Sequence, residues 1–123
     1  MGKGTVVRRV LQQTPNLVLS VSATTRAPRP GELDGRDYHF MGDAEFDRLA
    51  DEDGFLEWAE VFGARYGTPS GPVIAELERG NDVLLEIDVQ GAGQVRRRRP
   101  DATLIFLAPP SEADLVARLQ DRR

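Results

Sequence analysis

The sequence contains no cysteine and a single histidine, His39, among its 123 residues. Without cysteine the chain can form neither a disulfide framework nor a thiolate metal site, and one histidine excludes a site built from histidine pairs. No apolar run approaches the length that a membrane-spanning helix requires, and the first residues lack the apolar stretch of a secretory signal. We therefore expect a cytoplasmic protein with no membrane association.

The charge balance argues against nucleic-acid binding. Acidic residues outnumber basic ones by 20 to 16, for a formal net charge of −4, which disfavours a general nucleic-acid binder. The arginine run at residues 96–99 is better explained by cations that complement a helix C-terminus before Pro100. Apolar residues make up 40% of the chain, as in an ordinary globular domain with a modest core.

Apolar periodicity predicts strands that alternate with helices. The predicted strands are residues 17–21, 37–41, 55–62, 64–69, 82–89 and 103–108. The predicted helices are residues 5–13, 43–54, 72–79, 90–99 and 111–123. Asp43 is the expected N-cap of the second helix, with Phe46 facing inward. Apolar strands separated by helices imply a parallel sheet covered on both faces, which is an α/β fold.

The first residues resemble the second half of a phosphate-binding loop. Gly2, Lys3, Gly4 and Thr5 precede an apolar-periodic helix, whose N-terminus could face a bound phosphate while the lysine reaches it. A frayed chain end is the alternative, and the motif alone is weak.

The segment at residues 22–36 is a long polar loop after a predicted strand. Ligands of open α/β sheets bind outside the carboxyl ends of the strands. Ser22, Arg26 and Arg29 lie in this loop, and guanidinium forks match phosphate oxygens well. A solvated basic loop is the alternative, and the residues alone do not decide between the two.

Three carboxylates stand at positions that suggest chemistry. Glu86 and Asp88 end the predicted strand 82–89 on the same side, where carboxylates commonly hold Mg²⁺ directly or through water; acids that mark the exit into solvent are the alternative. Glu57 lies within an apolar strand, either as a paired core acid or as an acceptor for the donor edge of guanine. Tyr38, Tyr66 and Thr68 could add hydroxyl groups, or they could serve packing.

Five stretches together resemble the guanylate kinase family, whose members transfer phosphate from ATP to GMP. They are "SVSATTRAPRPGE", "GRDYHF", "FLEWAEVFGARYGTP", "LLEIDVQGA" and "IFLAPPS…RL", in the family's order and spacing. The resemblance implies a P-loop nucleoside-monophosphate-kinase-like parallel sheet in a single domain, residues 1–123. In it, residues 1–36 hold the partial phosphate loop and the phosphate-gripping loop. Residues 37–80 form an inserted GMP-binding lobe, and residues 81–123 supply core strands, helices and the start of a lid.

The same resemblance implies a set of site residues. Lys3 and Arg122 would be catalytic, and the site for the ATP phosphates would comprise Gly2, Lys3, Gly4 and Thr5. The implied GMP-binding residues are Ser22, Arg26, Arg29, Glu32, Tyr38, Glu57, Tyr66, Thr68, Glu86 and Asp88. Glu86 and Asp88 would also act indirectly on the metal. The implied cofactor is Mg²⁺ with ATP as phosphate donor, and the implied substrates are GMP and ATP.

The resemblance also places the family's first strand, the front of its phosphate loop and its C-terminal elements outside this sequence. We therefore expect strands without neighbours in the parallel sheet, association into homo-oligomers through those edges, and no kinase turnover by this stretch alone. A non-catalytic guanylate-kinase-like module that binds GMP or a phosphorylated partner is the alternative function. The presence of Lys3 and Arg122 favours the enzyme.

Overall fold

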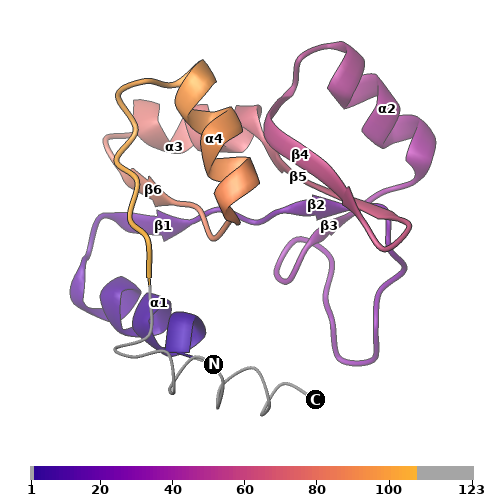
Figure 1. Ribbon diagram of the computed structural model, residues 1–123. Coiled ribbons are helices and arrows are strands. Elements are labelled where there is room, and N and C mark those ends of the chain that lie inside the picture. Colours follow the sequence, from indigo (N-terminus) through magenta and orange to yellow (C-terminus); the bar gives the residue numbers. More distant parts are fainter. Residues whose placement is uncertain (1, 108–123) are drawn as a thin grey trace, which may run out of the picture. The chain divides into compact units, whose positions relative to one another are not determined.

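The computed structural model describes residues 2–107 (Figure 1). Its helices are α1 (Gly2–Gln13), α2 (Asp43–Asp51), α3 (Ser70–Glu78) and α4 (Val89–Arg98). Its strands are β1 (Leu17–Leu19), β2 (Ala23–Thr24), β3 (His39–Phe40), β4 (Phe55–Val61), β5 (Ala64–Pro69) and β6 (Asp82–Leu84). The chain divides into two compact units, one of Met1–Pro15 with Thr103–Arg123 and one of Asn16–Ala102. None of the helices within residues 2–107 is long and apolar enough to span a bilayer.

The larger sheet has four strands in the order β3-β2-β5-β4. β2 runs parallel to β3 and antiparallel to β5, and β4 and β5 form a hairpin. Phe62 and Gly63 form the hairpin turn with φ of 51° and 80°, a left-handed backbone that glycine adopts without strain. The predicted sequence of strand, turn and strand is confirmed here.

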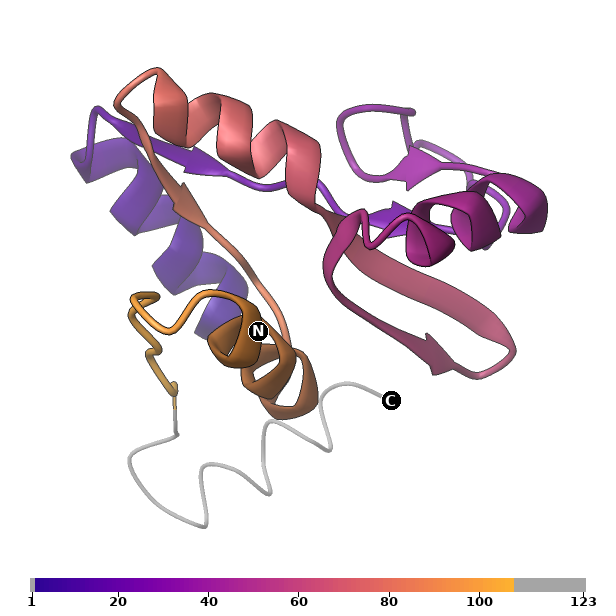
Figure 2. The ribbon, with the colours of Figure 1, turned by 90° about the horizontal axis from the view of Figure 1, so that it is seen from above.

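Helix α2 covers one face of this sheet (Figure 2). Phe46 of α2 is fully buried against Ala23 and Phe55, as its predicted inward position requires. The prediction that Asp43 caps the helix is wrong, because the N-cap is Gly42. Asp43 instead accepts a hydrogen bond from the Arg65 guanidinium at 2.9 Å, which ties α2 to β5.

A second, two-stranded sheet pairs β1 with β6 in parallel, Leu17 opposite Asp82. Its strands are shorter than the sequence predicts. The strand expected at residues 82–89 ends at Leu84. Among the described residues β6 pairs with β1 alone, and this pairing ends after three residue pairs. The apolar residues around it still form a core, in which Leu56, Val73 and Val95 are buried. Strands and helices together make the predicted α/β fold.

Three further predictions concern the two ends of the sequence. Residues 103–107 form no strand, and Ile105 and Phe106 are 77% and 78% exposed. A strand depends on ladder hydrogen bonds to a neighbour, and none of the described strands pairs with this run. The predicted helix at residues 111–123 lies outside the described residues. The predicted helix at residues 5–13 starts earlier, at Gly2.

Candidate functional site

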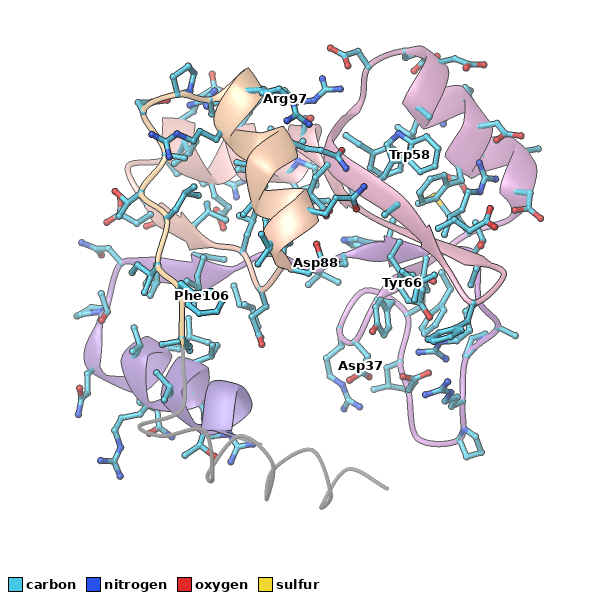
Figure 3. All side chains as sticks on the ribbon, in the orientation of Figure 1. Asp37, Trp58, Tyr66, Asp88, Arg97 and Phe106 are labelled. Carbon is cyan, nitrogen blue, oxygen red and sulfur yellow. The ribbon has the colours of Figure 1, made fainter. Side chains whose placement is uncertain are left out.

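The predicted GMP-binding residues of the four-stranded sheet share one face. Directly opposed residues on paired strands point to the same side of a sheet. Glu57 lies opposite Thr68, and Tyr66 lies two residues before Thr68 on β5, so all three side chains leave the sheet together. Trp58 points to the other face, toward α2, and Figure 3 shows Trp58 and Tyr66 on opposite sides of the sheet. We call the face that bears Glu57 and Tyr66 the site face.

A β-bulge in β4 gives Glu57 its direction. The register shifts between Phe55, which pairs with Pro69, and Glu57, which pairs with Thr68. The extra residue is Leu56, which enters the core with Val73 and Val95. Without the bulge, Phe55 and Glu57 would point to the same side. With it, Phe55 packs on Phe46 while Glu57 joins the site face.

Glu57 is a buried carboxylate, 9% exposed. Its Oε2 accepts a hydrogen bond from the Thr68 hydroxyl at 2.9 Å. Burial is the main cause that raises the pKa of Glu57, and the charge of Asp88 raises it further, while hydrogen bonds from the hydroxyl and the backbone N–H of Thr68 oppose both. The Thr68 hydroxyl thus anchors one of the two carboxylate oxygens.

Arg26 is held in a fixed orientation by Glu32. The guanidinium donates from both Nη1 and Nη2 to the two carboxylate oxygens, at 2.9 and 3.0 Å. Glu32 also accepts from the backbone N–H of Arg29 at 2.7 Å. These bonds lower the pKa of Glu32 to about 2 and raise the pKa of Arg26 above its usual range. Both groups are therefore ionised at neutral pH.

Aromatic side chains surround the Arg26 guanidinium. It lies 5.1 Å from the ring centre of Tyr38 and 5.9 Å from that of Phe40. The Tyr38 and Tyr66 rings are 6.0 Å apart, and both hydroxyl groups add to the rise in the pKa of Arg26. The structure therefore brings the predicted residues Arg26, Tyr38 and Tyr66 together. Phe40 was not predicted from sequence, although its spacing of two from Tyr38 within a strand is a signal that could have indicated it.

Asp88 begins helix α4 as its N-cap. Its Oδ1 accepts the backbone N–H of Gly91 at 2.7 Å, which satisfies one donor of the first helical turn. Glu86 is exposed, and residues 85–88 are not part of a strand. The prediction that Glu86 and Asp88 close a buried strand is therefore wrong, because the ladder has already ended at Leu84.

Glu86 and Asp88 do not belong to a cluster of metal ligands in the described part of the chain. Within residues 2–107, no group of three or more acidic or histidine side chains gathers to hold an ion. One oxygen of Asp88 already serves the helix cap. The indirect contact of Glu86 and Asp88 with Mg²⁺ through metal-bound water stays a prediction.

The remaining predicted residues lie as follows. Ser22 is half-buried, directly before β2, and its carbonyl accepts the His39 N–H at 2.8 Å. Arg29 is exposed in the loop that follows β2. Gly2, Lys3, Gly4 and Thr5 form the first turn of α1, so they belong to a helix N-terminus and not to a preceding loop. Arg122 lies outside the described residues.

Known proteins are similar to this sequence over nearly its whole length. The family model described as guanylate kinase matches residues 1–123. A guanylate kinase of Thermobifida fusca is 58% identical over 122 residues, which is 99% of this chain and 62% of that protein. One of Thermus thermophilus is 58% identical over 119 residues, 97% of this chain and 54% of that protein.

A solved structure agrees with these sequence relatives. The crystal structure of guanylate kinase from Anaplasma phagocytophilum superposes with a TM-score of 0.75 at 40% identity, over 95% of this chain and 61% of the other. The chain thus spans between 54% and 62% of the length of these relatives. Because the family model covers the whole sequence and the fold agrees, the chain belongs to the guanylate kinase family.

Proposed function

We propose that residues 16–102 bind GMP and that the whole protein transfers phosphate from ATP to GMP. The observation that carries the proposal is the buried carboxylate of Glu57 on the same sheet face as Tyr66. An anchored carboxylate accepts hydrogen bonds from N1–H and the exocyclic amine of guanine, and adenine lacks that pair of donors. Asp88, near enough to Glu57 to raise its pKa, would be the second acceptor for the base.

The cluster around Arg26 would bind the phosphate of GMP. Tyr66 and Thr68 are two residues apart on β5, roughly 7 Å, so the base and the phosphate would lie along one strand. Glu32 fixes the guanidinium of Arg26, and Tyr38, Tyr66 and the exposed Arg29 would supply further donors. Ser22, directly before β2, would face the base.

Phosphoryl transfer would depend on positioning and on neutralised charge rather than on a general base. Gly2, Lys3, Gly4 and Thr5 begin α1, and the positive end of a helix dipole favours the ATP phosphates. Mg²⁺ bound with ATP would neutralise charge on the transferred group, and Glu86 and Asp88 would orient its water molecules. Lys3 and Arg122 would contact the transferring phosphate.

The test is a calorimetric titration of the chain with GMP and with AMP. We expect GMP to bind at least about 100-fold more tightly, because AMP leaves the Glu57 carboxylate buried without its donors. Equal affinities would refute the assignment of the base site. A coupled assay of ADP release with ATP and GMP, on the full-length protein, then separates the enzyme from a binding module, which would bind GMP without turnover.

A further inference from the structure

Gly91, in the first turn of α4, lies against the carboxylate of Glu57. A Cβ placed on Gly91 would be 2.5 Å from Glu57 Oε1 and 3.2 Å from Asp88 Oδ1. Gly91 is buried, and it lies within a helix without the positive φ that calls for glycine. Alanine would be the better helix former at this position. The close approach of Glu57 therefore depends on the absence of a side chain at position 91, and not on the conformational freedom of glycine.

Two hydrogen bonds connect helix α4 to β4 at Trp58, the residue after Glu57. The Gln94 side chain accepts the Trp58 N–H at 3.1 Å and donates to the Trp58 carbonyl at 3.0 Å, as a neighbouring strand would. One turn of helix separates Gln94 from Gly91, and Val95 packs in the core with Leu56. The helix therefore cannot move away from the strand without breaking these contacts.

The flexible part of this contact is the end of the Glu57 side chain. Its Oε2 is held by Thr68, while Oε1 faces Gly91. Because both backbones are fastened, a methyl group at position 91 would move the carboxylate and leave the helix in place. Such a shift would alter the acceptor that we assign to guanine.

We propose that Gly91 is a positioning residue that sets where the Glu57 carboxylate lies and thereby determines selectivity for guanine. The proposal rests on the proposed function, since it presumes that Glu57 receives the base. Gly91 itself touches no reacting group. It acts through the close approach that its missing side chain allows.

The experiment compares Gly91→Ala with Gly93→Ala, a matched control in the same helix. The nearest atom to a Cβ on Gly93 is Arg97 Nη1, at 3.8 Å, so the control adds the same methyl group away from Glu57. We expect Gly91→Ala to weaken GMP about 10- to 100-fold, the loss of one hydrogen bond to a charged group. It should also reduce the preference for GMP over IMP, which lacks the exocyclic amine. The control should stay within about twofold of the parent.

Two further measurements separate positioning from damage to the fold. The thermal midpoint of Gly91→Ala should fall by no more than about 5 °C, because the displaced atoms are the end of a flexible side chain and alanine favours the helix. The carboxyl ¹³C resonance of Glu57, recorded without nucleotide, should move in Gly91→Ala and not in Gly93→Ala. An unmoved resonance, or unchanged GMP affinity and selectivity in Gly91→Ala, would overturn the proposal. If the parent chain does not prefer GMP over AMP, the proposed function fails, and the Glu57 resonance still decides whether Gly91 positions the carboxylate.

Discussion

Replacing Glu57 with glutamine should stabilise the fold and weaken GMP binding at the same time. Burial raises the pKa of this carboxyl group in the folded state, so ionised Glu57 costs stability at neutral pH. The contribution of such a group to stability is fully present below its unfolded pKa and is lost as the pH rises through the folded value. Glutamine carries no charge, and its carbonyl oxygen can keep the bond from Thr68.

The size of the binding effect follows from the contacts of Glu57. Thr68 occupies Oε2, so the carboxylate can still accept from two guanine donors. In Glu57→Gln the carbonyl oxygen stays on Thr68 and the amide places N–H groups where guanine also has N–H groups. Loss of a hydrogen bond to a charged group costs about 1.5–3 kcal/mol, and an unpaired donor adds to that. We therefore expect GMP to bind about 100-fold more weakly, which corresponds to about 3 kcal/mol.

Titration calorimetry with GMP measures the change in affinity. Urea unfolding at about pH 7 and at about pH 4 measures the change in stability. The variant should be more stable than the parent at the higher pH, and this advantage should shrink at the lower pH, where Glu57 becomes protonated in both states. GMP affinity of the parent should also fall as the pH decreases toward the pKa of Glu57. If Glu57→Gln binds GMP as the parent does, Glu57 does not receive the base. If its stability advantage is absent at neutral pH, the carboxylate is not destabilised by burial.

Two other substitutions test the phosphate cluster and the sheet. Arg26→Lys should reduce affinity for GMP about tenfold or more in the same titration, although the charge is kept. An ammonium group cannot form the two parallel bonds that the guanidinium makes with Glu32. Parent-like affinity would mean that the loop is a solvated surface. Gly67→Ala should lower the free energy of unfolding in urea by about 1–3 kcal/mol, because its Cβ would lie 2.8 Å from both Phe55 Cδ1 and Trp58 Cβ. A Cβ on Gly71 meets nothing within 4 Å, so Gly71→Ala serves as the control. Equal stability of these two alanine variants would contradict the close packing of the hairpin.

Local sequence patterns predicted the elements whose structure depends on near neighbours. Helix α2 with Phe46 inward, the hairpin of β4 and β5 and the helix that precedes Pro100 all follow from apolar period and turn residues. The prediction was wrong for residues 103–107, which have the apolar composition of a buried strand. Composition reports what a segment could bury, while a strand also requires a partner with free backbone groups.

The order of the amino acids specifies the chemistry that is available: a carboxylate within an apolar strand, a loop that contains Arg26 and Arg29, and tyrosines spaced along strands. Which of these groups meet depends on the packing of distant segments. The bulge at Leu56 turns Glu57 to the side of Thr68, and the pairing of β2 with β3 and β5 brings Arg26 to Tyr38 and Tyr66. The contact between Gly91 and Glu57 joins residues 34 positions apart, and no local pattern marks it. Such contacts follow from how strands and helices pack at long range, and a periodicity of two or of 3.6 residues carries no information about the register between distant segments.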